Sequence, residues 1–288
     1  MPDRDQTEQR PIEREEFRRR AASLLARFRS HTDADPEWTY LSPSYALVGL
    51  DEWSIGDGAA ADVDACIRDL HRSAARRGIQ RIVVEVVASD APALAAFRAA
   101  GLRDSSVFAV ASSAGTSSVR VQVDTVRTAG TEDRATIVAL AREEALFQAV
   151  STSAGTSVHQ PVALFEALAD DWLGDLGSTT VLVAETGLPT GRPEILGLMV
   201  VQDTESAASE RGLGLPERHG YIAVASVTAT ARGRGTGSAL FAAAEAWCVG
   251  RGLDAIALDY IVDNAAARPF WSARGFRPVV IRLAMRVG

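Results

Sequence analysis

The chain has 288 residues, of which 47% are hydrophobic and 23% charged, and its formal net charge at pH 7 is −7. This composition supports a substantial core and excludes an intrinsically disordered protein, while the length accommodates one large or two small domains. The acidic balance argues against a nucleic-acid partner, because binding to phosphates needs a basic face.

The N-terminal region is charged throughout and lacks the apolar stretch of a signal peptide, and no later apolar run is long enough to cross a bilayer. Cys66 and Cys248 are the only cysteines, and both fall within helical patterns. Neither a disulfide framework nor a metal site is therefore expected. We predict a cytoplasmic protein that binds no metal, with Cys248 as a buried helix residue rather than a nucleophile.

The first half of the chain has few elements. A charged helix is expected at about 12–30, a strand at 45–50 and a second strand at 82–87. A helix and a turn at Gly101 follow. The Ser/Gly-rich run 111–118 is typical of a linker.

The second half reads as a mixed α/β domain. Strands are predicted at 119–127, 178–185, 192–203, 220–229, 254–262 and 276–287. Helices are predicted at 131–149, 160–174, 235–250 and 264–274. Two polar stretches, 151–157 and 203–219, are expected to be loops that face a substrate or are solvated spacers.

The run Arg232-Gly-Arg-Gly-Thr-Gly237 lies between a buried-strand pattern and an Ala-rich helix. Glycine permits positive φ and a close approach of an anion to the main chain, and the helix that follows adds its unpaired N–H groups. The turn therefore suits a phosphate group. Neither the dinucleotide fingerprint nor a nucleotide P-loop matches the spacing, and an ordinary loop is the alternative.

Downstream residues give this turn a context. Asn264, Ala267 and Gly275-Phe276 follow one helix and one strand later. Together with Arg232, Gly235 and Gly237, this order resembles the GCN5-related N-acetyltransferase (GNAT) family, from about Val119 to the C-terminus. In that family the first motif binds the pyrophosphate of acetyl-CoA, and the second follows at this spacing.

The resemblance implies a set of residues that bind acetyl-CoA as co-substrate. The pantetheine arm would lie in a gap between strands 220–229 and 254–262. It would pair with backbone groups of the first strand and contact side chains of the last helix, while the turn holds the pyrophosphate. The implied residues are Ala225, Val227, Arg232, Gly233, Arg234, Gly235, Thr236, Gly237, Ser238, Asn264, Ala267, Phe270 and Trp271. The backbone N–H of Val227 would stabilise the thioester oxyanion.

The resemblance also implies catalytic roles. His219 stands where many relatives carry the base that keeps the amine neutral, with Tyr221 in reserve. The tyrosine that serves as general acid in the family, by protonating the coenzyme A thiolate, is replaced here by Trp271. Either Tyr260 serves as this acid, or coenzyme A leaves as a thiolate. For His219 and Tyr260, a plain structural role is the alternative.

The first half repeats part of the second. Gly101 falls on Gly275 at an offset of 174 residues, and the same offset aligns strand 82–87 with strand 256–261. It also aligns Asp90 with Asn264, Ala93 with Ala267, Phe97 with Trp271, and Gly58, Ala61 and Val63 with Arg232, Gly235 and Gly237. Because Asp62 and Val63 would oppose a pyrophosphate, we interpret the first half as a truncated copy that has lost cofactor binding. Two unrelated units of similar composition are the alternative.

We therefore predict an α/β fold with a mixed, mostly antiparallel sheet flanked by helices, the GNAT fold, in two copies of which the first is truncated. The predicted domains are 1–116 and 117–288. The predicted function is transfer of acetyl from acetyl-CoA to a primary amine of a small, cationic molecule in a ternary complex, without nucleic-acid or membrane partners. A non-catalytic acyl-CoA-binding protein and a tandem acetyltransferase like mycothiol synthase are the alternatives, and a homodimer is an open option.

Overall fold

The computed structural model describes residues 45–49, 63, 67–68, 71–72, 81–113, 125–151, 162–175, 177–186, 193–205 and 215–286. The chain divides into two compact units, one of Met1–Val107 with Val279–Gly288 and one of Phe108–Pro278. Several predicted features lie wholly or mostly outside the described residues: the helix at 12–30, the linker at 111–118, the loops at 151–157 and 203–219, Cys66, and the positions Gly58, Ala61 and Asp62.

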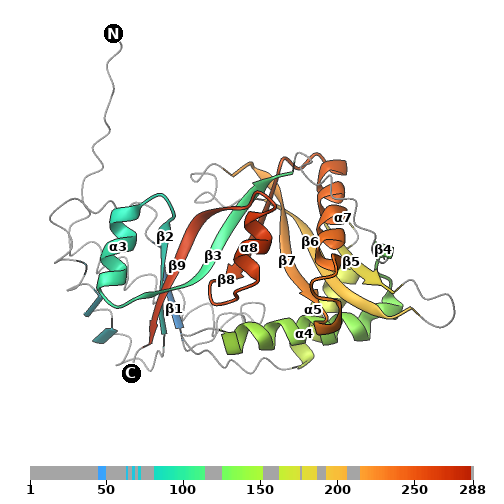
Figure 1. The fold of residues 1–288 in the computed structure, drawn as a ribbon, viewed down its shortest axis with the longest axis horizontal. Helices are drawn as coiled ribbons and strands as arrows, with labels where there is room; N and C mark the ends of the chain where they lie inside the picture. The colour runs from blue at the N-terminus through green and yellow to red at the C-terminus, as the bar shows by residue number, and fades with distance from the viewer. Residues whose placement is uncertain are drawn as a thin grey trace, which may run out of the picture. The chain divides into compact units, whose positions relative to one another are not determined.

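The unit Phe108–Pro278 contains five complete strands in the order β8-β7-β6-β5-β4 (Figure 1). It also contains β3 (Arg103–Ser112) from Phe108 onward, and β3 is the other neighbour of β8 in the sheet. Neighbours from β4 to β7 are antiparallel, whereas β7 and β8 are parallel. The strands are β4 (Thr125–Thr128), β5 (Thr179–Glu185), β6 (Ile195–Glu205), β7 (Arg218–Val227) and β8 (Ala255–Ile261). The helices are η2 (Thr131–Asp133), α4 (Arg134–Ser151), α5 (Val162–Gly174), η3 (Ala229–Ala231), α7 (Thr236–Gly250) and α8 (Ala267–Ser272).

Helices cover both faces of these strands. Buried residues of α4 and α5, such as Ile137 and Trp172, form one core cluster with Leu198 and Val200 of β6. On the other face, a Cβ added to Gly197 of β6 would lie 3.0 Å from a methyl group of Leu240 in α7. Side chains of a strand alternate between faces, so Leu198, Val200 and Gln202 face α4 and α5.

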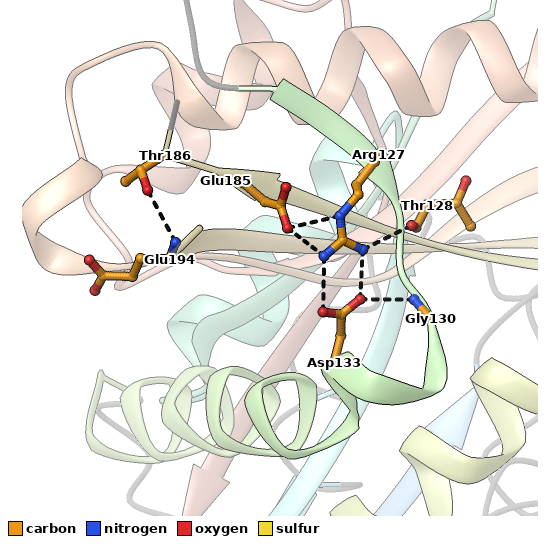
Figure 2. A network of polar contacts seen from close by, with 7 residues as sticks. All are labelled: Arg127, Thr128, Gly130, Asp133, Glu185, Thr186 and Glu194. Carbon is orange, nitrogen blue, oxygen red and sulfur yellow. Dashed lines mark hydrogen bonds and ion pairs between the residues drawn. The ribbon is translucent and has the colours of Figure 1, made fainter. Parts of the chain in front are cut away.

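A polar network fixes the start of α4 against the sheet (Figure 2). The Arg127 guanidinium of β4 donates to both carboxylate oxygens of Asp133, at 2.7 and 3.0 Å, and to Glu185 of β5. Asp133 is 5% exposed and also accepts from Gly130 N at 2.8 Å. These carboxylates raise the pKa of Arg127 through hydrogen bonds. The network thus ties β4, β5 and the first turn before α4 together.

The other unit contains β1 (Tyr45–Gly49), β2 (Arg81–Val87), α3 (Ala91–Ala99), the start of β3 (Arg103–Ser112) and most of β9 (Arg277–Arg286). β1 is parallel to β2, and β2 is antiparallel to β9. The side chain of Asp90 caps α3 by accepting from Ala93 N at 2.9 Å, as short polar residues do at helix N-termini.

The repeat predicted from sequence has a structural counterpart. Shifted by the separation of Gly101 and Gly275, β2 and β3 coincide in their bounds with β8 and β9. The parallel pair Ala46↔Ile82 likewise coincides with Gly220↔Ile256. Both glycines have positive φ, +94° and +83°. Two segments of the chain therefore fold alike, whereas the predicted boundary between 116 and 117 stays a prediction.

The predicted strands and helices are confirmed within a few residues wherever their ends fall in the described part of the chain. The C-terminal strand differs from the predicted domain division, which placed it wholly in the domain 117–288. β9 begins at Arg277, but from Val279 onward it belongs to the same unit as β2, with which it pairs.

Candidate functional site

The parallel strands β7 and β8 separate part of the way along. Among the residues that the structure describes, the last pair of their ladder is Ile222↔Leu258, yet both strands continue to Val227 and Ile261. The neighbouring ladder is irregular at the same level: Val200 faces Val224 and Val201 faces Ile222, which leaves Ala223 as an extra residue. Such a bulge bends a strand and strengthens its twist, so the strands part at Ala223.

The main chain of β7 is exposed toward this gap. Thr228 N donates to Leu196 O of the β6 side at 2.9 Å. Backbone groups of a strand alternate between its two edges, so Ser226 and Val224 also face β6, whereas Ala225 and Val227 face the gap. The two residues predicted to pair with a cofactor arm therefore carry main-chain groups on the open edge.

The glycine turn lies between η3 and α7. Gly233 and Gly235 have φ of +72° and +94°, and Gly235 is the residue that precedes α7. Only glycine adopts this region at little cost. The first amides of α7 have no partner within the helix and carry the positive end of its dipole. Thr236 is buried, and its hydroxyl points back to Ala231 O at 3.4 Å.

The Phe270 ring packs beside Gly237 at this turn. A Cβ added at position 237 would lie 3.2 Å from the Phe270 ring and 3.7 Å from a methyl group of Val227. Phe270 is half-buried, whereas Trp271 is only 7% exposed and packs edge-on against Phe241 and Phe276. Of the two aromatic residues predicted to border the arm, Phe270 is thus the one in contact with the turn.

Arg274 was missed by the sequence interpretation. Its guanidinium lies 3.4 Å from the centre of the Phe270 ring and donates to Ser238 Oγ at 2.6 Å and to Phe270 O at 2.6 Å. Burial lowers its pKa. The residue places a cation beside the first turn of α7. Its only sequence signal is its position immediately before Gly275-Phe276.

The Arg232 side chain takes an unexpected direction. Its Nε donates to Val227 O at 3.0 Å, and its guanidinium lies 5.6 Å from the centre of the Phe147 ring on α4. It therefore covers the carbonyl group on the gap edge. Arg234, by contrast, is exposed on the turn.

Asn264 lies three residues before Ala267, the first residue of α8. The Asn264 side-chain oxygen accepts from Ala266 N at 3.1 Å, and its main-chain oxygen accepts from Ala267 N at 3.0 Å. Ala267 is buried at 9% exposure. In the described structure, Asn264 thus organises the start of this helix, next to the end of β8.

The three predicted catalytic residues differ in position. His219 is 1% exposed and lies at the start of β7, before the ladder with β8 begins. Tyr260 is 8% exposed, and burial raises its pKa, which makes its phenol a weaker acid. Tyr221 is half-buried, and its hydroxyl donates to Asp259 Oδ2 at 3.0 Å. The structure thus brings Tyr221, but not His219, to the point where the strands part.

Residues 132–175 include eight acidic side chains, which could favour a cationic acceptor or form a solvated surface, and most of them are exposed. Of these eight, Asp133, which binds Arg127, is buried and Glu144 is half-buried, whereas the other six are exposed. Asp170 pairs with Arg134 on the surface. Burial raises the pKa of Glu144, while the nearby Arg232 opposes the shift.

The remaining predictions concern a thiol, metals and membranes. Cys248 is fully buried, and burial raises its pKa to about 12, so its interpretation as a packed helix residue is confirmed. In the described ranges, no three His, Cys, Asp or Glu side chains gather as metal ligands would. Of the helices described, none has the length and apolarity required to span a membrane.

Comparisons with known proteins agree with this geometry. Residues 147–276 match the Acetyltransferase (GNAT) family. A GCN5-related N-acetyltransferase from Sphaerobacter thermophilus is similar with a TM-score of 0.55 and 16% identity, over 85% of this chain and 73% of that chain. A GNAT-family acetyltransferase from Colwellia psychrerythraea is similar with a TM-score of 0.52 and 11% identity, over 85% and 78%.

A tandem GNAT protein from the clavulanic acid biosynthesis pathway is similar with a TM-score of 0.48 and 13% identity, over 84% of this chain and 75% of that chain. No curated protein matches the sequence. The Sphaerobacter and Colwellia structures confirm the predicted fold class, a mixed α/β GNAT fold with a mostly antiparallel sheet flanked by helices.

Proposed function

We propose that the protein is an acyl-CoA-dependent N-acetyltransferase that transfers acetyl from acetyl-CoA to a primary amine of a small, cationic molecule. The observation that carries this proposal is the gap between β7 and β8, which opens beside a turn with two left-handed glycines at the start of α7. The segment that contains both features matches a family of acetyltransferases.

The residues present suit acetyl-CoA as co-substrate. Ala225 and Val227 offer main-chain groups to the amides of the pantetheine arm, and the amides from Gly233 to Ser238 suit the pyrophosphate. Arg274 adds positive charge beside Ser238. Gly237 keeps the space beside Phe270 open, because a side chain there would meet the ring. Arg232 must leave Val227 O before the arm can pair with that carbonyl.

Binding of this kind supplies rate by orientation, because it holds the thioester and the amine together. The bulge at Ala223 turns the main chain of β7 toward the gap, where an N–H of Ala225 or Val227 would stabilise the oxyanion. His219 as base requires an amine to reach a side chain that is 1% exposed. An unchanged rate of thiol release in His219→Ala would exclude His219 as the base. Loss of thiol release in Tyr260→Phe, with unaltered affinity for acetyl-CoA, would support Tyr260 as the acid.

A non-catalytic acyl-CoA-binding protein is the second candidate, and Trp271 favours it. The residue stands where the family carries an acidic tyrosine, and it lies within an aromatic cluster. This candidate predicts acetyl-CoA binding without any release of thiol.

The N-terminal unit is proposed to be a second copy of the fold that no longer binds cofactor, an arrangement like that of mycothiol synthase. The coincidence of β2 and β3 with β8 and β9 supports duplication. Val63, which corresponds to Gly237, is fully buried, so a side chain fills that position. A homodimer and a cytoplasmic location stay predictions.

Calorimetric titration with acetyl-CoA tests the proposal directly. Binding at micromolar concentration is expected, and its absence would remove both candidates. Release of free thiol with spermidine, kanamycin and L-lysine as acceptors then separates an enzyme from a binding protein. A matched variant, Gly235→Ala, should weaken binding because its backbone has φ of +94°.

A further inference from the structure

Two polar side chains meet where β7 and β8 part. Tyr221 OH donates to Asp259 Oδ2 at 3.0 Å, and the ladder ends one residue beyond Tyr221, at Ile222↔Leu258. Asp259 is therefore the first residue of β8 past the last pair. Continued in register, it would have faced Ala223, the residue at which β7 bulges away.

Both side chains lie on the face of the sheet covered by α4 and α5. Tyr221 is paired with Gln202, which alternates with Val200 and Leu198 of the α4/α5 core cluster. Ala257 is the register partner of Tyr221, and Asp259 follows two residues later on the same face. The opposite face at this level is filled by α7, since a side chain at Gly220 would collide with Cys248.

Each side chain is half-buried rather than enclosed. The narrow end of the gap is where a thioester would lie if the pyrophosphate end of acetyl-CoA occupies the turn before α7. An amine approaching from the α4/α5 face would then meet Asp259 beside the reactive carbonyl. His219 is sealed within the fold, and Tyr260 points to the side of the sheet opposite Asp259, since the two are adjacent in β8.

We propose that Asp259 is the base of the acyl transfer and that Tyr221 orients it, an inference that rests on the proposed function. The Asp259 carboxylate takes a proton from the acceptor's ammonium group, which leaves a neutral amine. The amine nitrogen forms a bond to the thioester carbon, and the carbon–sulfur bond breaks. The second amine proton goes to the departing coenzyme A thiolate, and Asp259 returns its proton to water.

The decisive variant is Asp259→Asn, which keeps the shape of the side chain and an oxygen that accepts from Tyr221. Thiol release from acetyl-CoA is measured with methylamine as the acceptor probe, because it is small enough to enter any amine site. We expect kcat to fall about 10²–10⁴-fold, the usual contribution of a general base. The Kd for acetyl-CoA should stay unchanged. Tyr221→Phe should lower kcat less.

The matched control is Asp254→Asn, an exposed aspartate immediately before the other end of β8. It should leave kcat and Kd at wild-type values. As a separate readout, Asp259→Ala should recover rate on addition of formate, which supplies a carboxylate in the space created. A residue with a structural role alone would show no such rescue.

The outcomes separate the two hypotheses. If the wild type does not bind acetyl-CoA, the proposed function fails and the inference fails with it. If it binds acetyl-CoA but releases no thiol with methylamine or with the other amines, only the binding protein remains, and both the acetyltransferase function and the role of Asp259 fail. If thiol is released but Asp259→Asn retains the wild-type kcat, the proposed function stands while Asp259 loses its role.

Discussion

Gly237→Val tests the turn before α7 by filling the space beside Phe270. A Cβ at this position would lie 3.2 and 3.3 Å from two atoms of the Phe270 ring and 3.7 Å from a methyl group of Val227. A single Cβ is tight there, and the two further methyl groups of valine fit only if the ring moves. Val63 stands at the corresponding position of the N-terminal unit, so the substitution imposes that unit's residue on the turn.

The expected cost follows from two opposing terms. Overpacking of a filled site costs about 1–3 kcal/mol, and replacing glycine within a helix returns up to about 0.5 kcal/mol. The free energy of unfolding should therefore fall by about 1–2 kcal/mol. Displacement of Phe270 would also disturb the turn before α7, the proposed pyrophosphate site, so the Kd for acetyl-CoA should rise at least about tenfold, which corresponds to 1.4 kcal/mol of binding free energy.

Urea denaturation and calorimetric titration measure the two quantities separately. Gly250→Val is the matched control, because it lies at the other end of α7 and an added Cβ would meet nothing within 4 Å. It should leave both values near wild type. A folded Gly237→Val protein with unaltered affinity for acetyl-CoA would refute the assignment of this turn to the pyrophosphate.

Three further predictions concern stability and reactivity. Arg127→Met leaves the buried Asp133 with fewer donors, so it should lower the free energy of unfolding in urea by about 2–3 kcal/mol. Arg134→Met removes a surface ion pair and should lower it by less than about 1 kcal/mol. Equal effects of the two variants would contradict this. Burial raises the pKa of Glu144, so its ionised form destabilises the folded state above that pKa. Glu144→Gln should therefore raise the urea midpoint of unfolding at pH 7. This gain in stability should disappear as the pH falls below the ordinary pKa of glutamate. Burial raises the pKa of Cys248 to about 12, so this thiol should resist iodoacetamide in the native protein and react in urea. Peptide mapping by mass spectrometry measures both. Rapid labelling of the native protein would contradict the burial of Cys248.

The order of strands and helices was predictable because it depends on local patterns. The apolar run from Tyr221 to Val227 and the glycines at 233 and 235 place a strand, a turn and a helix with little reference to the rest of the chain. The linked motif at Asn264 and Gly275 supplied the family resemblance. The structure confirms both the elements and the fold.

The contacts at the site were not predictable in the same way. The bulge at Ala223 exists only relative to β6, and Asp259 meets Tyr221 only because β7 and β8 are parallel in one particular register. No spacing in the sequence encodes that register. His219 was predicted from its position along the chain, and such a position does not predict that its side chain is only 1% exposed.

The hydrogen bond made by Arg232 bears on how acetyl-CoA would bind in the proposed function. In the structure its Nε satisfies Val227 O, a carbonyl that the parting of β8 leaves without a strand partner. Under the proposed function, acetyl-CoA would displace Arg232 Nε from this carbonyl in order to pair with Val227. In that proposed complex an amide of the cofactor arm would replace the lost donor, and the released guanidinium would stay near the turn before α7, the proposed pyrophosphate site. Such an exchange would conserve a hydrogen bond at Val227 O and free a cation for the phosphate, so the proposed function gives Arg232 a role both before and after binding.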